Sequence, residues 1–207
     1  MSYHYTERED PKPVRTGPGR PPNEALDRQV IIAARRLIRE GKPLTIQEIV
    51  EASGASRSAI YRRWPSLNEL LADALDHGRT NRVYSFDGPI KPILEELLFD
   101  RMHETVGRGY TDKHYRRHLE LMMANPQLQK VYWEKHASRR LKCMQRALQA
   151  AKDNGEIRRN VDIEAALDAI YGVRTFQTAV RGVPFDSPEA VQRARAAFDL
   201  LRKGMEP

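Results

Sequence analysis

Apolar residues recur every three or four positions along most of this 207-residue sequence, and that spacing is what most restricts its fold. Near the N-terminal end the series runs Leu26, Val30, Ala33, Leu37. Farther along, the same spacing gives Ala137, Leu141, Met144, Leu148, Ala151. Side chains spaced in this way share one face of an α-helix, and the alternation typical of strands is absent over any useful length. The sequence therefore predicts an all-α fold.

Proline, glycine and helix-capping residues divide the chain into three parts. Residues 1–22 are polar and rich in proline and glycine, which predicts a flexible basic arm. Residues 23–84 are expected to form a unit of short helices that ends in a connecting helix from Ser66 to about Tyr84. Residues 85–207 are expected to form a larger, wholly helical unit.

Composition narrows the class of protein. A hydrophobic fraction of 40% and a charged fraction of 30% suit a globular chain, and the net charge of +7 permits nucleic-acid binding. No apolar run is long enough to span a membrane, and the first residues lack the apolar centre of a secretory signal. The single cysteine, Cys143, excludes an internal disulfide and suits a reducing compartment. We therefore expect a cytoplasmic protein. Cys143 is interpreted as a small buried apolar residue, with a redox sensor as the alternative.

The most informative stretch is residues 44–71. Thr45 with Glu48 has the spacing of a capping box, which predicts a short helix that the glycine of Ser53-Gly54-Ala55 ends. Ser56 is expected to cap a second short helix, which ends before Pro65. Two short helices joined by a glycine turn have the spacing of a helix-turn-helix, whose second helix enters the major groove of DNA.

The residue types in this stretch suit DNA. Acidic residues are absent between Glu51 and Glu69, whereas three arginines fall there. Arg57 and Ser58 begin the second helix and are predicted to meet base edges. Sugar–phosphate contacts are predicted for Tyr61, Arg62 and Arg63, and helix-terminal phosphate contacts for Thr45 and Ser56. Trp64 is interpreted as a core residue.

The segment from about Arg28 to Leu71 resembles the DNA-binding domain of tetracycline-repressor (TetR) family regulators. The matching features include Ala33-Ala34, Gly41, the Ala52–Ser56 turn and Ile60–Ser66, whereas Leu67 stands where the family usually has a lysine. Asn154–Arg158 followed by Val161-Asp162 resembles a second passage found in many members. The resemblance implies a DNA-binding transcriptional regulator, expected to be a repressor that a small-molecule effector releases from a palindromic operator. It also implies that Arg20 enters the minor groove.

The resemblance further implies that the C-terminal unit binds the effector and forms a homodimer through a four-helix bundle. The predicted dimer seam comprises Leu167, Ile170, Tyr171, Arg174, Val191, Phe198 and Leu201. The predicted effector pocket comprises Met102, Val106, Tyr110, Met122, Trp133, Tyr171 and Phe176. Core packing would explain the pocket residues equally well.

Other functions are weaker interpretations. The sequence has no glycine-rich phosphate loop, nucleophile elbow or interpretable carboxylate pair, so we expect neither an enzyme nor a cofactor. A helical protein whose C-terminal unit has a non-regulatory binding or enzymatic role is the alternative, and a helical scaffold is a third. His114 and His118 have the spacing of metal ligands on one helix face, yet a solvated basic face is the preferred interpretation of residues 113–118, over a metal site or a second nucleic-acid patch.

Overall fold

The computed structural model describes residues 24–78, 84–86, 88–100 and 110–207, and all the regular elements within them are helical. The elements are α1 (Glu24–Glu40), α2 (Ile46–Ser53), α3 (Arg57–Tyr61), α4 (Leu67–Asp76), α5 (Ile90–Glu95), the π-helical turn η1 (Glu96–Asp100), α7 (Asp112–Ala124), α8 (Pro126–Tyr132), the π-helical turn η2 (Trp133–Ala137), α9 (Ser138–Asp153), α10 (Ile163–Ala179) and α11 (Pro188–Met205). The predicted all-α class is confirmed. None of the described helices is long and apolar enough to cross a membrane. The arm, with Arg20, and the pocket candidates Met102 and Val106 lie outside the described residues.

The predicted caps begin the helices of the N-terminal part. The hydroxyl of Thr45 accepts a hydrogen bond from the backbone N–H of Glu48 at 3.2 Å, and Ser56 and Ser66 do the same at the starts of α3 and α4. Such caps satisfy backbone donors that have no partner within the helix. Gly54 ends α2 with a φ of +69°, a conformation that a side chain makes costly.

Two helices differ from the prediction. The connecting helix α4 ends at Asp76, not near Tyr84, because Gly78 takes a φ of +86° and turns the chain. The helix predicted from the spacing of Ala137 to Ala151 is present as α9, and it continues a helical run that starts at Pro126 and that the π-helical turn η2 interrupts between α8 and α9. Such turns shift the register of the residues that follow and are frequent at functional sites.

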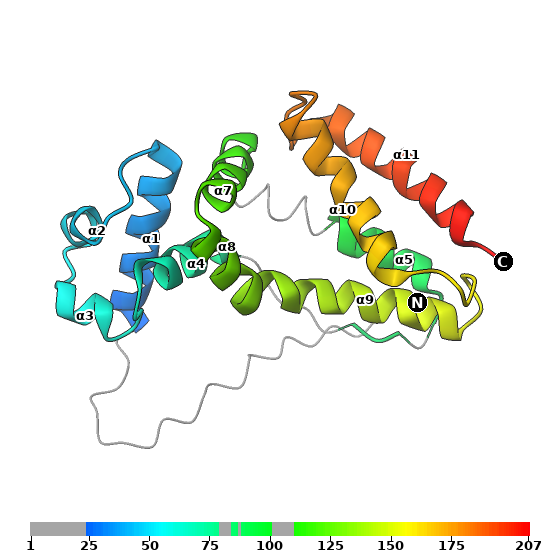
Figure 1. Ribbon diagram of the computed structural model, residues 1–207, viewed down its shortest axis with the longest axis horizontal. Helices are drawn as coiled ribbons and strands as arrows, with labels where there is room; N and C mark the ends of the chain where they lie inside the picture. The colour runs from blue at the N-terminus through cyan, green and yellow to red at the C-terminus, as the bar shows by residue number, and fades with distance from the viewer. Residues whose placement is uncertain (1–23, 79–83, 87, 101–109) are drawn as a thin grey trace, which may run out of the picture.

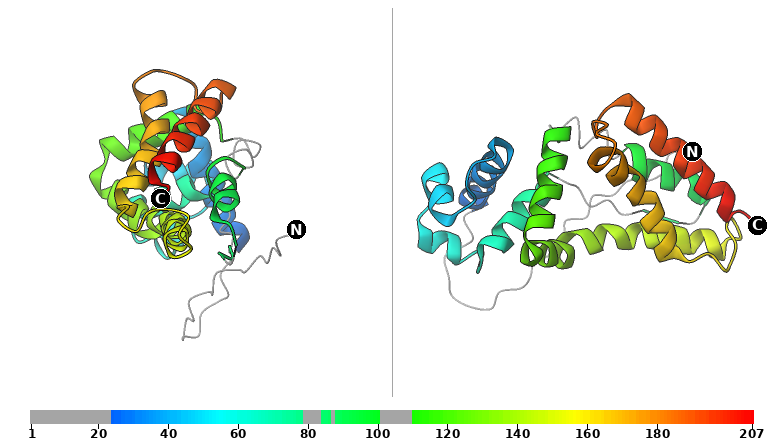
Figure 2. Two further views of the ribbon diagram at one scale, coloured as in Figure 1. Left: turned by 90° about the vertical axis from the view of Figure 1, so that its right-hand side faces the viewer. Right: turned by 45° about the horizontal axis from the view of Figure 1, so that its top comes forward.

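The helices bury two apolar cores. The helices that supply most of each core lie toward opposite ends of the molecule (Figure 1). The first core is formed by the four helices α1, α2, α3 and α4 together with three side chains of α7 and α8, namely Met122, Leu128 and Tyr132. The second lies among α5, η1, α9, α10 and α11, and includes Leu148, Leu167 and Phe198. The helical run from α8 to α9 therefore connects the two ends, as Figure 2 also shows.

Candidate nucleic-acid interface and neighbouring cavity

Helix α3 is anchored by two side chains and leaves the others outside. Ala59 and Ile60 are buried, and Ile60 belongs to the first core, whereas Arg57, Ser58 and Arg62 are exposed. Tyr61 is 45% exposed, which is high for an aromatic side chain. The exposed side chains carry guanidinium, hydroxyl and phenol groups, which donate hydrogen bonds to phosphate oxygens and to the edges of bases.

Arg63 occupies a different environment from its neighbours. Its guanidinium forms an ion pair with Asp27 of α1 and donates to the carbonyl of Ala59 at 3.3 Å. The structure thus holds it against α1, whereas the prediction assigned it to phosphate. Thr45 and Ser56 are exposed at the starts of α2 and α3, as the sequence placed them.

Trp64, which follows α3, is buried in the first core. Its side chain is 6% exposed, and its indole N–H donates to a carboxylate oxygen of Asp73 at 2.8 Å. Burial alone would raise the pKa of Asp73, but hydrogen bonds from His136 and Trp64 outweigh it and hold the pKa below its usual value.

Acidic residues of α4 pair with basic residues of η2 and α9. His136 lies between Asp73 and Asp76, at 2.8 and 3.1 Å, and Arg140 forms an ion pair with Asp76. A further ion pair joins Lys135 to Glu69 at 2.5 Å. Burial alone would lower the pKa of His136, but its two carboxylate partners raise it. We call Asp73, Asp76, His136 and Arg140 the α4–α9 clamp.

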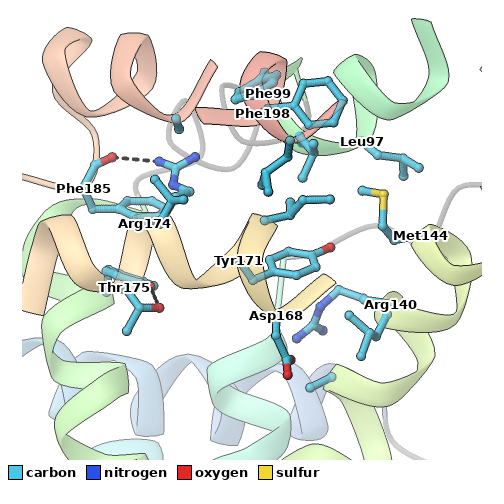
Figure 3. A pocket seen from close by; sticks show the side chains of 18 of the residues that line it. Leu97, Phe99, Arg140, Met144, Asp168, Tyr171, Arg174, Thr175, Phe185 and Phe198 are labelled. Atoms are coloured by element: carbon cyan, nitrogen blue, oxygen red, sulfur yellow. Dashed lines mark hydrogen bonds between the residues drawn. The ribbon is translucent and has the colours of Figure 1, made fainter. Parts of the chain in front are cut away.

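A cavity of about 510 Å³ lies beside the clamp, among η1, η2, α9, α10 and α11 (Figure 3). Its apolar lining includes Leu97, Phe99, Met144, Ile170 and Phe198. Its charged lining consists of Arg140, Arg174, Glu164 and Asp168. Arg140 therefore belongs both to the cavity and to the clamp.

The structure distributes the predicted pocket residues among several places. Tyr110, Trp133 and Tyr171 line the cavity. Met122 is buried in the first core, and Phe176 is 50% exposed and absent from the lining. Met122 thus faces the other core and Phe176 faces outward, because apolar spacing identifies one face of a helix without identifying what that face contacts.

Several cavity residues were not recognised as such from the sequence. Arg174 was assigned to the seam, and Arg140 and Phe185 were not singled out at all. A usable signal was present for Arg140: the acidic residues of α4 at positions 69, 73 and 76 form one helical stripe that needs basic partners.

Three of the predicted seam residues face inward. Leu167, Ile170 and Phe198 are buried in the second core, so they are not available to a partner chain. Val191 and Leu201 are half-buried, and Tyr171 and Arg174 line the cavity. The outward face of α10 instead carries small or apolar residues at helical spacing: Ala165, Ala169, Gly172, Phe176 and Ala179. On α11, Leu200 is 73% exposed.

The segment 113–118 is not a solvated basic face throughout. Arg116 pairs with Asp112 and donates to the carbonyls of Thr178 and Gly182, which docks α7 on the end of α10. His118 is buried against the ring of Tyr132. In the described part of the chain, no group of three or more potential metal-binding side chains occurs. Cys143 is half-buried and forms no disulfide.

Family models of known proteins match both the N-terminal and the C-terminal part of the chain. The family model "Bacterial regulatory proteins, tetR family" matches residues 30–74, and that of the "Tetracyclin repressor-like, C-terminal domain" matches residues 96–197. The chain is 26% identical over 178 residues to YdeS, an uncharacterised HTH-type transcriptional regulator of Bacillus subtilis, with 79% of this chain and 83% of the relative covered.

Solved structures share the fold. A TetR transcriptional regulator from Agrobacterium tumefaciens matches with a TM-score of 0.63 at 19% identity, covering 88% of this chain and 95% of that one. SmeT, the repressor of the Stenotrophomonas maltophilia multidrug efflux pump SmeDEF, matches with a TM-score of 0.53 at 18% identity, covering 86% and 89%.

Proposed function

Because this chain belongs to the tetR family of bacterial regulatory proteins and is a DNA-binding transcriptional regulator, we propose that it is a homodimeric repressor released from its operator by a small molecule. The observation that carries the proposal is the arrangement of α3, whose apolar side chains are buried while Arg57, Ser58, Tyr61 and Arg62 are exposed. A helix anchored in this way can enter a major groove without disturbing its own core.

Each exposed group has a role in this proposal. Arg57 and Ser58 read base edges, since arginine pairs with guanine through two hydrogen bonds. Tyr61 and Arg62 contact the sugar–phosphate backbone, and the hydroxyl-capped starts of α2 and α3, at Thr45 and Ser56, receive phosphates. Arg63 is left out of the contact set because Asp27 already neutralises it.

Two copies pair through α10 and α11 in the proposed dimer. The small and apolar stripe of α10 and the exposed Leu200 of α11 support this seam, because an exposed apolar surface of this kind marks an interaction site. The pairing places two reading helices in major grooves about 34–36 Å apart, or a multiple of that distance, on a palindromic operator.

The clamp is the proposed route from the cavity to the reading helix. An effector that packs against Arg140 can shift its guanidinium away from Asp76, and the same acidic face of α4 holds His136 and, through Asp73, Trp64. The effector weakens DNA binding only if it binds more tightly to the arrangement that misreads the operator.

The direct test is a gel shift with DNA from upstream of the protein's own gene. We expect binding whose affinity falls steeply with salt, because arginine–phosphate contacts release counterions. A chain that binds neither this DNA nor any other double strand at low salt contradicts the proposed function.

A further inference from the structure

We infer that the cavity takes a largely apolar, aromatic molecule that carries one anionic group, and that Arg174 binds this group. The inference rests on the proposed function in one respect, since it identifies the chemistry of the effector. It is drawn from the charges of the cavity wall and from the surroundings of the Arg174 side chain.

Within the described part of the chain, Arg174 is a largely buried cation without an acidic partner. Its guanidinium lies over the ring of Phe185, 4.3 Å from the centroid, and one Nη donates to the Phe185 carbonyl at 2.9 Å (Figure 3). Its Nε is buried and has no hydrogen-bond acceptor among the described residues, and no carboxylate of those residues forms an ion pair with its guanidinium. Burial lowers the pKa of Arg174 to about 10, so it stays charged at neutral pH.

An enclosed cation of this kind is costly unless an anion compensates it. Removing a charge from water carries a penalty that a matching charge and hydrogen bonds repay. The planar guanidinium presents parallel donors that suit a carboxylate or sulfonate, and the Phe185 ring fixes its plane. An anionic ligand group at this position supplies the compensation that the described protein groups do not.

The other charged residues that line the cavity favour an anion at Arg174 over one elsewhere in the cavity. Arg140 is already paired with Asp76. Glu164 accepts a hydrogen bond from Gln145, and both Glu164 and Asp168 are exposed. Asp168 precedes Arg174 by about 9 Å along α10, from the helical rise per residue. The acidic groups therefore lie toward the Arg140 end of the cavity and away from Arg174, as Figure 3 shows for Asp168.

The rest of the wall selects an apolar, aromatic body. The lining between the charged ends is made by Leu97, Phe99, Met144, Ile170 and Phe198, with Trp133 and Tyr171 adding aromatic faces. A cavity of about 510 Å³ lies within the size range of pockets that enclose drug-sized molecules.

Two fluorescent probes with one scaffold test the inference on the full chain. 8-Anilinonaphthalene-1-sulfonate carries an anionic sulfonate, and N-phenyl-1-naphthylamine lacks it. We expect the wild-type chain to bind the sulfonate at least about tenfold more tightly, the effect of one good charge-assisted contact. Equal affinities, or a preference for the neutral probe, overturn the inference without any variant.

A pair of arginine variants localises the contact. Arg174→Gln is expected to weaken sulfonate binding about tenfold and to leave the neutral probe within about twofold. The control is Arg181→Gln, since Arg181 is exposed and lies over Phe176 outside the cavity lining. Sulfonate binding unchanged by Arg174→Gln, or equal losses for both probes, contradicts the assignment.

The same preparations separate this inference from the proposed function. Operator binding by a wild-type chain that shows no preference for the anionic probe defeats the inference alone. The expected preference in a chain that binds no DNA defeats the proposed function and leaves the ligand class of the cavity standing.

Discussion

The indole nitrogen of Trp64 lies 2.8 Å from a carboxylate oxygen of Asp73, and this hydrogen bond ties the end of the reading helix to α4. The other oxygen of Asp73 faces His136, which also faces Asp76, the partner of Arg140. A continuous polar path therefore runs from the core behind α3 to the wall of the cavity. Such a path is a physical candidate for coupling, and its energetic contribution is measurable.

Asp73→Ala is expected to destabilise the chain by about 1–3 kcal/mol, because it leaves the buried indole N–H of Trp64 without its acceptor. Asp73→Asn retains an acceptor oxygen and is expected to cost less. The free energy of unfolding in urea measures both. Equal losses for the two variants would show that the hydrogen bond to Trp64 contributes little.

His136→Gln is expected to destabilise the chain more at about pH 6 than at about pH 9. The folded-state pKa of His136 lies above its usual 6.5, so the stability that its protonation contributes is full below that value and is lost as pH rises through the raised pKa. Because the pKa of Asp73 is lowered from its usual 3.8, the stability that its ionised carboxylate contributes is fully present above that value and does not change across this pH range. Thermal unfolding across this range measures the difference.

His77→Gln supplies the matched control for that experiment. Burial, with Arg35 and Arg28, lowers the pKa of His77, so protonation of His77 opposes folding at low pH. We expect the opposite pH trend from this variant. The same trend in both variants would mean that a general effect of pH, and not the clamp, dominates.

Arg57→Ala is expected to weaken binding to the cognate operator by about 1–3 kcal/mol, with little loss on a scrambled sequence, because Arg57 is assigned to a base edge. Arg159→Ala, in the exposed loop after α9, is the control and should change neither affinity. Equal losses on both sequences would reassign Arg57 to phosphate.

Gly54→Ala is expected to destabilise the chain by about 1 kcal/mol or more, because residue 54 has a φ of +69°. An added Cβ would meet nothing within 4 Å, so the cost is conformational and not steric. Gly204→Ala, within α11 and equally open, should instead raise stability slightly. Chemical denaturation of the two variants provides the comparison, and a neutral Gly54→Ala would contradict the account of the turn.

Phe176→Arg is expected to shift the chain from dimer to monomer, because it places a charge on the exposed stripe of α10. Met123→Arg alters a side chain that is 81% exposed on α7 and should leave the dimer intact. Sedimentation velocity over a range of concentrations distinguishes the two. A dimer that survives Phe176→Arg with undiminished affinity would place the seam elsewhere.

Local signals in the sequence predicted the N-terminal helices well, and the reason is chemical. Thr45, Ser56 and Ser66 cap helices through hydrogen bonds that span three residues, so their partners are adjacent in the sequence. Gly54 is likewise determined by its own backbone conformation. These features need no knowledge of distant contacts.

Features set by distant contacts were harder to predict. Helix α10 is apolar on two sides, with Leu167 and Ile170 inward and Ala169 and Phe176 outward, so periodicity could not say which side a partner would cover. Arg63 and Arg62 are neighbours of the same type, yet only Arg63 meets Asp27 of another helix. The cavity depends on α9, α10 and α11 together, and no single helix encodes it.

The sharing of the first core by α7 and α8 has a consequence for protein engineering. A fragment that stopped at residue 84 would lack Met122, Leu128 and Tyr132, which pack against the side chains of α1 and α4. The uncovered apolar surface would favour aggregation over autonomous folding. A chimera meant to transplant the operator specificity of this chain should therefore exchange the residues of α3 alone, or carry α7 and α8 along with the smaller helices.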